Sequence, residues 1–272
     1  MKNNTLSIIL ASLFGVLSPS LLLAQKKEKN TPPAQAPISQ ETNPLYRIYQ
    51  RAVQFEDFPV ARMALMQLMM QSPEKTAYED TLVMLYFSSG MPAQAVVLGR
   101  QRLEKNPDNA QLAEVVAMAE ETTGLLKDAL DRYEQLEKKN SRPQRKYKIA
   151  ALQYRLKRYG ECQASVNQLM SMPAADTLKV NFVYNDGSNQ MVQLKAAALN
   201  VLGMAAYDLG QLEDAEALFQ AALQLDKDFV QPKINLNALN QEKNAREASQ
   251  KKDGTPSTPT DTAKKPSPDP KK

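Results

Sequence analysis

The residues of this sequence that could do chemistry are concentrated in one basic run between Lys138 and Arg158. The run holds no acidic residue, and tyrosines interleave with its cations. Ammonium and guanidinium groups bind carboxylates through charge-assisted hydrogen bonds. The run therefore indicates a dock for an acidic peptide, a C-terminal carboxylate or an anionic polymer, and the alternative is a solvated charged face. Its cations are Lys138, Lys139, Arg142, Arg145, Lys146, Lys148, Arg155, Lys157 and Arg158.

Catalytic chemistry has few candidates in this chain. There is no histidine and only one cysteine, which excludes Ser-His-Asp and Cys-His relays, histidine-bound metals and intramolecular disulfides. We find no Gly-rich phosphate loop and no nucleophile beside a base, so we expect no enzymatic activity, no cofactor and no metal. Cys162 is interpreted as a small buried residue. A methionine run at helical spacing is interpreted as core, and it comprises Met63, Met66, Met69 and Met70.

Segments at both ends are not expected to join the folded core. Residues 1–24 combine a basic start, a short apolar stretch and a small residue before a polar one, which is typical of a secretory signal peptide. We expect cleavage after Ala24, with an uncleaved anchor as the alternative, and hence export to the periplasm or secretion. Residues 25–40 and 249–272 are polar and contain proline, so both should be disordered.

The excess positive charge of the chain resides in these flanks. The whole sequence carries a net charge of +4, whereas residues 41–240 hold 22 Lys and Arg against 24 Asp and Glu. A slightly acidic domain gives little support for nucleic-acid binding, and export would separate the protein from RNA. We therefore expect no nucleic-acid partner. After removal of the signal peptide, no apolar stretch is long enough to span a bilayer.

An internal repeat emerges when the sequence is aligned on a helix-ending residue five positions before a small residue. The aligned pairs are Gly90 and Ala95, Gly124 and Ala129, Gly210 and Ala215, Glu56 and Ala61, and Lys157 and Cys162. Around them, apolar residues recur at three- and four-residue spacing, which indicates two amphipathic helices in each unit. Pro73 and Pro107 close two units, because proline cannot continue a helix.

These residues resemble the tetratricopeptide repeat, a helix-turn-helix pattern of about 34 residues. In the clearest unit, Gly203, Ala215 and Phe219 fall on motif positions. The resemblance implies an all-α fold, a right-handed α-solenoid of about five units with a concave inner face, spanning residues 41–248. A helix over 230–248 should cap the last unit. The predicted units are 42–75, 76–109, 110–142, 143–176 and 196–229.

The helical pattern is interrupted at residues 177–195. Phe182 and Tyr184 lie in an alternating apolar run, and Asp186 and Gly187 come after it. An Asp-Gly pair between such runs predicts a β-hairpin, with an irregular loop as the alternative. Because an isolated hairpin is only marginally stable in water, this one must lean on a helix or on a partner. A packing role and a partner-binding role both stay open.

The resemblance also implies a binding surface, because ligands of this family usually lie in the groove lined by the first helix of each unit. Exposed Tyr, Phe and Met there would suit an extended or helical peptide, and the alternative is packing between repeats. The implied groove residues are Tyr46, Gln50, Met84, Phe87, Met118, Tyr147, Tyr154, Arg155, Asn200, Met204 and Tyr207. The Lys and Asn clamp that some family members use for a terminal carboxylate is absent. Its matching positions hold Tyr46, Gln50, Thr81, Gln111 and Val115.

These features together predict a non-catalytic interaction scaffold of the cell envelope, active in the assembly or regulation of an envelope or secretion complex. It would bind partner proteins or peptides through the groove and through the 177–195 hairpin. One alternative is a binding module for an anionic envelope polymer such as peptidoglycan, which rests on the basic run. Another is a non-catalytic subunit of an enzyme complex. The sequence identifies neither the partner nor the oligomeric state.

Overall fold

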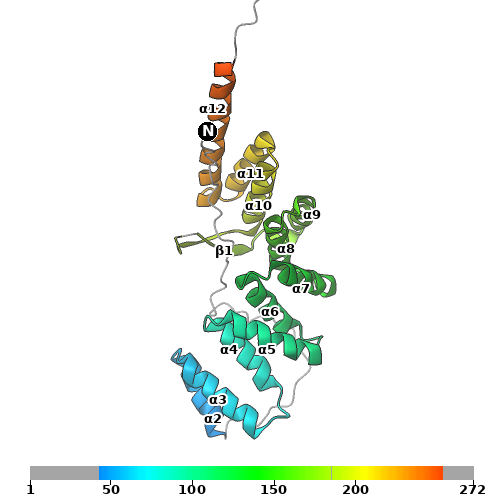
Figure 1. The fold of residues 1–272 in the computed structure, drawn as a ribbon, viewed down its shortest axis with the longest axis vertical. Helices are drawn as coiled ribbons and strands as arrows, with labels where there is room; N and C mark the ends of the chain where they lie inside the picture. Colours follow the sequence, from blue (N-terminus) through cyan, green and yellow to red (C-terminus); the bar gives the residue numbers. More distant parts are fainter. Residues whose placement is uncertain (1–42, 185, 254–272) are drawn as a thin grey trace, which may run out of the picture.

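The computed structural model describes residues 43–184 and 186–253, which are almost entirely helical. Within these residues, ten helices form five consecutive pairs stacked along one direction, and an eleventh helix comes after the last pair (Figure 1). A β-hairpin separates the fourth pair from the fifth. The predicted all-α solenoid with one insertion is thereby confirmed. The predicted signal peptide (1–24) and linker (25–40) lie outside the described residues.

Each pair consists of two helices joined by a tight turn. The first helices are α2 (Pro44–Gln54), α4 (Ala77–Ser88), α6 (Ala110–Thr122), α8 (Pro143–Arg155) and α10 (Leu194–Asp208). The second helices are α3 (Phe58–Gln71), α5 (Pro92–Lys105), α7 (Leu126–Lys139), α9 (Tyr159–Met170) and α11 (Leu212–Leu225). The first four pairs lie inside the predicted unit ranges. The fifth begins at Leu194, ahead of the predicted 196, because the hairpin runs directly into α10.

The turn inside each pair places one residue in the left-handed backbone region. Gly90, Gly124 and Gly210 have φ angles of +74°, +81° and +76°, which glycine adopts without steric cost. Glu56 and Lys157 occupy the same position with φ angles of 56° and 59°. A side chain in this region costs roughly 1–2 kcal/mol. The residues on which the repeat aligns in the sequence are therefore the points at which the chain reverses.

The two helices of each pair approach one another at a small residue five positions after the turn. All five of these residues are fully buried, so a larger side chain has no space. They are Ala61, Ala95, Ala129, Cys162 and Ala215. The prediction that Cys162 is buried is confirmed, and burial raises the pKa of its thiol to about 12.

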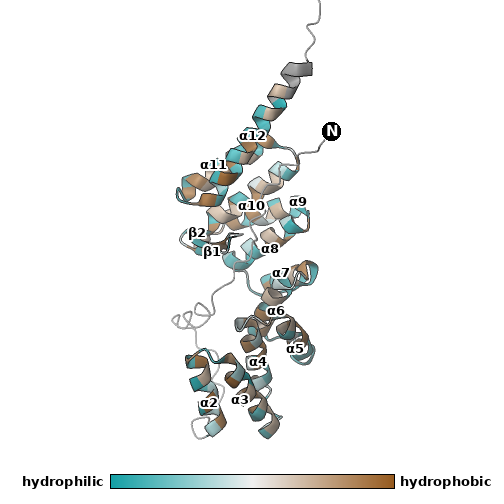
Figure 2. Cartoon of the chain, turned by 60° about the vertical axis from the view of Figure 1, so that its left-hand side comes forward, coloured by the Kyte–Doolittle hydropathy of each residue, from teal (hydrophilic) through white to brown (hydrophobic). Residues whose placement is uncertain are grey.

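The core divides into three apolar clusters along the stack. One lies in the first pair and α4, one in the second and third pairs, and one joins the fourth and fifth pairs to the hairpin. Figure 2 shows apolar and polar residues interleaved along the helices, as expected of a stack whose helices bury only part of their surface. Helix α8 belongs to two clusters. Its Ile149 and Leu152 pack toward the third pair, whereas Tyr147 and Ala150 pack toward the fifth.

The insertion is a two-stranded antiparallel hairpin, as the sequence predicts. It consists of β1 (Lys179–Val183) and β2 (Asn189–Gln193). Gly187 in the turn has a φ angle of +83°. The Asp186 carboxylate accepts hydrogen bonds from the backbone N–H and the hydroxyl of Ser188, so the turn is held by its own side chains.

The last helix, α12 (Val230–Asp253), covers the fifth pair. Phe229, just before it, and Leu239 within it are fully buried in the cluster of the fourth and fifth pairs. The sequence predicts a cap that ends at 248 and disorder from 249 onward, but the helix continues to Asp253. Lysine and glutamine, which make up three of the five residues 249–253, are good helix formers and favour this extension.

The interpretation of the methionine run as core is wrong for three of its four residues; Met69 is partly buried and packs against the cluster of the first pair. Met63, Met66 and Met70 are 64%, 43% and 81% exposed, while Leu65 and Leu68 on the opposite side of α3 are buried. Apolar residues surround α3 on several sides, so helical spacing alone does not indicate which stripe faces inward. The first pair has a neighbour on one side only within the described residues, and its other side stays uncovered.

We predict that Glu56→Gly and Lys157→Gly each raise the free energy of unfolding by about 0.5–1 kcal/mol, because glycine removes the strain of a positive φ. The converse change, Gly90→Ala, should lower it by about 1 kcal/mol. A Cβ at Gly90 would meet nothing within 4 Å, so backbone strain is the effect being measured. Urea unfolding followed by circular dichroism measures all three. Destabilisation by both glycine substitutions would contradict the assignment of strain to these turns.

We also predict that Cys162 resists thiol reagents in the folded protein. A thiol with a pKa near 12 holds almost no thiolate at pH 8.5, and its side chain is inaccessible. Reaction with Ellman's reagent at pH 8.5 should become fast only when urea unfolds the chain. Rapid modification without urea would show that the fourth pair opens readily.

Candidate functional site

The first helices of the second, third and fourth pairs lie on the same side of the stack as the hairpin. In Figure 1, α4, α6 and α8 lie toward the side from which the hairpin projects, whereas α5, α7 and α9 lie on the opposite side. We call the surface of α2, α4, α6, α8 and α10 the inner face. Eleven of its residues form the predicted groove, and their exposure decides which of them a partner could contact.

The inner face is accessible at its N-terminal end. Gln50 is exposed, and Tyr46, Met84 and Phe87 are each partly exposed. The amide of Gln111 in α6 lies 4.0 Å from the Met84 sulfur, so the surface continues from the second pair to the third. Aromatic and methionine side chains held on rigid helices suit the apolar side chains of a peptide.

The middle of the predicted groove is buried, which corrects the prediction for five residues. Met118, Tyr147, Tyr154, Asn200 and Met204 are each at most 8% exposed. Motif positions identify a helix face, but the neighbouring pair or α12 covers that face here. The Asn235 amide of α12 donates a hydrogen bond to Asn200 at 3.0 Å. Burial raises the pKa of both Tyr147 and Tyr154.

The C-terminal end of the inner face is covered by the chain itself. The Tyr207 hydroxyl of α10 donates a hydrogen bond to Glu242 of α12. Burial and this bond raise the pKa of Tyr207 to about 12. Helix α12 therefore takes the place that the first helix of a sixth pair would occupy. Arg155, the remaining groove residue, lies 3.6 Å from Glu121 and is also engaged.

The basic run is paired with carboxylates from other helices. Arg145, 4% exposed, lies 2.5 Å from Glu114 of α6 and 3.7 Å from Glu137 of α7. Lys148 lies 3.1 Å from Glu121 of α6. These glutamates precede the run in the sequence, so the run itself contains no negative charge. The fold nevertheless brings the glutamates close enough to neutralise its cations. These ion pairs connect α8, in the fourth helix pair, to α6 and α7 in the third.

Only two of the six predicted patch residues remain available for binding. Lys146 lies 3.4 Å from Glu137, and Arg158 pairs with the glutamate three residues further on. Arg142 and Lys157 are exposed, and neither has an ion pair with a residue that the structure describes. The predicted basic patch is therefore mainly an electrostatic joint between pairs.

One face of the hairpin packs against the solenoid. The Phe182 ring is buried, with its centroid 5.0 Å from that of Phe229 in an edge-to-face arrangement and 5.2 Å from that of Tyr184. Asp186 and Gly187 lie at the exposed tip. The packing role predicted for the hairpin is therefore present, and it leaves the opposite face and one edge uncovered.

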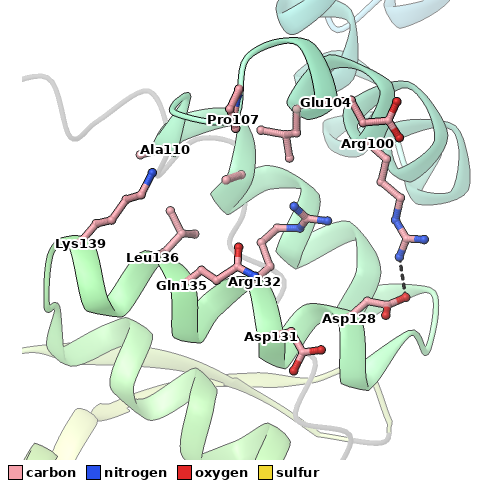
Figure 3. Close-up of a pocket in the computed structure, with 12 residues that line it drawn as sticks. Arg100, Glu104, Pro107, Ala110, Asp128, Asp131, Arg132, Gln135, Leu136 and Lys139 are labelled. Carbon is pink, nitrogen blue, oxygen red and sulfur yellow. Dashed lines mark hydrogen bonds and ion pairs between the residues drawn. The ribbon is translucent and has the colours of Figure 1, made fainter.

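Sequence reasoning missed a recess of about 500 Å³ between α5 and α7, which Ala110 and Ala113 of α6 also line (Figure 3). Arg100 lies 2.6 Å from Asp128, and Arg132 lies 2.8 Å from the buried Glu120. These ion pairs join α5, α6 and α7. The residues that line the recess are Arg100, Leu103, Glu104, Pro107, Ala110, Ala113, Asp128, Asp131, Arg132, Gln135, Leu136 and Lys139. In the sequence, the charged residues of this recess cannot be distinguished from charged residues on a solvated helix face, so no pattern predicted the recess.

Neither a metal cluster nor a membrane span is present among the described residues. No group of three or more cysteine, aspartate and glutamate residues in them is arranged to hold a metal ion. No helix in this part of the chain is both long enough and apolar enough to cross a membrane.

We predict that Arg145→Ala lowers the free energy of unfolding by about 3 kcal/mol, because Glu114 and Glu137 lose the buried guanidinium that they share. The carbonyls of Leu136 and Asn140 lose the same donor. The matched control, Arg142→Ala, removes an exposed side chain three residues away and should change it by less than about 0.5 kcal/mol. Urea unfolding measures both. Equal effects would mean that the joint between the third and fourth pairs does not depend on this cation.

The architecture is shared with known proteins. Residues 196–229 match the family model described as tetratricopeptide repeat. No curated protein matches the chain. The structure is similar to MamA, with a TM-score of 0.56 and 15% identity, over 70% of this chain and 94% of that one. It is also similar to a tetratricopeptide repeat protein from Parabacteroides merdae, with a TM-score of 0.59 and 17% identity, over 79% of this chain and 80% of that one.

A third similar structure is YrrB, described as a TPR protein with an unusual peptide-binding site. Its TM-score is 0.56 at 11% identity, over 75% of this chain and 93% of that one. Such identities show a shared fold and nothing finer. Earlier pairs depart from the motif; Arg102, for example, is buried beside Glu79 and Asp80 at 2.9 and 2.8 Å. The fifth pair thus matches the tetratricopeptide-repeat model, and the whole solenoid shares the fold of solved tetratricopeptide-repeat proteins.

Proposed function

We propose that this protein is a non-catalytic scaffold of the cell envelope that binds a segment of a partner protein along its inner face. The observation that carries the proposal is the partial exposure of Tyr46, Met84 and Phe87 on two adjacent first helices. Rigid helices present these side chains with little loss of freedom on binding. The similarity to YrrB, described as having a peptide-binding site, supports a peptide ligand.

Binding is assigned to the N-terminal half of the inner face because the C-terminal half is covered. Asn200 and Met204 of α10 are buried, and Tyr207 is bonded to α12. On α2 and α4, by contrast, Gln50 is exposed, and Tyr46, Met84 and Phe87 are partly exposed. A partner segment would therefore enter over the first two pairs and run toward the hairpin.

The envelope location is proposed from the signal-peptide pattern of residues 1–24. The structure adds a compatible feature. Cys162, the single cysteine of the chain, is fully buried, so an oxidising compartment would not readily cross-link the folded protein. Periplasmic residence is the preferred form of the proposal, and secretion is the other.

The peptidoglycan-binding alternative loses most of its support in the structure. It depends on a positive surface, and Arg145, Lys146 and Lys148 are paired with Glu114, Glu121 and Glu137. No observation favours the third hypothesis, a non-catalytic subunit of an enzyme complex, over a scaffold in general.

The test uses the exported chain, residues 25–272, as bait in a crosslinked pull-down from envelope fractions. We predict that Met84→Glu reduces recovery of the partner at least tenfold, because a carboxylate on the inner face would have to be desolvated on binding. Val97→Glu is the matched control, since Val97 is exposed on the second helix α5. Melting curves confirm that both variants fold. Recovery of no specific partner, or equal recovery by both variants, would exclude the proposal.

A further inference from the structure

The hydrogen-bond register of the hairpin determines which backbone groups point outward. The Tyr184 N–H donates to the Ser188 carbonyl, and the Leu194 N–H donates to the Leu178 carbonyl, both at 2.8 Å. In an antiparallel pair, residues that exchange hydrogen bonds alternate with residues that do not. The even-numbered residues of β1 therefore bond to β2. The odd-numbered residues direct their N–H and C=O groups away from it.

The two outer edges of the hairpin differ in what covers them. On β2, the Gln193 N–H donates to the Asp226 carboxylate at 2.9 Å. The Gln190 side-chain amide donates to the Asp228 carbonyl at 2.7 Å, and its oxygen accepts from the Val230 N–H at 3.2 Å. Side chains thus fix the β2 edge to the turn between α11 and α12.

The β1 edge is open. Along it, Lys179, Asn181 and Val183 present outward backbone N–H and C=O groups, and none of these groups has a hydrogen-bond partner among the described residues. Figure 1 shows the hairpin extending from the stack on the side of the inner face, between the base of α12 and α6. A row of unpaired donors and acceptors of this kind is a template for another strand.

We propose that the open edge of β1 binds an extended segment of a partner protein as a third β-strand. The inference rests on the proposed scaffold function and assigns a second part of the partner's binding surface to the hairpin. Main-chain hydrogen bonds to Lys179, Asn181 and Val183 supply affinity, and alternate side chains of the segment supply selectivity.

The chemistry beside the edge defines the segment. On the packed face, its side chains would neighbour Val180 and the buried Phe182, so alternate positions should be apolar. On the other face lies Lys179, an exposed cation without an ion pair to any residue that the structure describes. An acidic residue of the segment beside Lys179 would complete the match.

A second copy of this chain fits the edge less well than a partner. In a two-fold antiparallel pairing of two β1 strands centred on Asn181, Lys179 would lie opposite Val183 of the other copy. The lysine would gain no carboxylate, and a lysine on a short edge strand disfavours pairing between identical edges.

The test selects random nine-residue peptides, displayed on phage, against the exported chain, and titrates the best peptide by calorimetry and amide hydrogen exchange. We expect the peptide to alternate apolar and polar residues, to contain an acid, and to protect the amides of Lys179, Asn181 and Val183. Asn181→Pro deletes one outward N–H of β1 without touching the ladder. It should weaken binding at least tenfold.

The matched control is Asn189→Pro, which deletes an outward N–H from β2 and should leave the affinity unchanged. A second measurement avoids variants altogether, because N-methylation of alternate peptide amides should abolish binding to the native chain. Failure to select a peptide, or protection confined to α2 and α4 with no effect of N-methylation, would overturn strand addition. The scaffold proposal is tested separately: an empty pull-down, or equal recovery of the partner by Met84→Glu and Val97→Glu, would remove it as well. Concentration-dependent protection of β1 without peptide would assign the edge to a second copy instead.

Discussion

The structure depends on one constraint: a pair of amphipathic helices cannot bury both of its sides alone, so each pair is stable only against its neighbours. Within a pair, the small residues such as Ala61 and Ala215 let the helices approach until no solvent reaches them. Between pairs, the apolar surface that faces the next helix pair must be covered by that pair. The two ends of the stack meet this constraint differently. Helix α12 covers the fifth pair, whereas Met63 and Met70 on α3 stay exposed at the other end.

The same constraint explains the joint between the third and fourth pairs. There Ile149 and Leu152 of α8 pack against the third pair, and Arg145 and Lys148 of α8 reach glutamates of α6 and α7. Ion pairs of this kind add less to stability than an apolar interface of equal size, but breaking one leaves a costly unpaired charge. The basic run thus holds two halves of the solenoid in register. Aromatic, methionine and backbone groups, rather than free cations, are therefore the chemistry offered to a partner.

Local features were predictable from the sequence, and long-range ones were not. The turn residues Gly90 and Glu56, the buried Cys162 and the hairpin all result from short patterns whose physical cause is local. The partner of Arg145 could not be predicted because Glu114 lies 31 residues away on another helix. The prediction that the five buried groove residues are accessible failed for the same reason, because the burial of a helix face depends on which neighbouring helix packs over it. The prediction that Met63, Met66 and Met70 are in the core failed because α3 has apolar residues on several sides. Its sequence therefore does not indicate which side faces inward.

The central claim is that a partner binds the inner face, and site-specific photocrosslinking tests it most directly. A photoreactive amino acid is placed at Gln50, exposed on the first helix α2, or at Val97, exposed on the second helix α5. Irradiation of intact cells that produce either variant should give a specific adduct with a partner protein from position 50 and none from position 97. An adduct from position 97 alone, or equal adducts from both positions, would contradict an inner-face site.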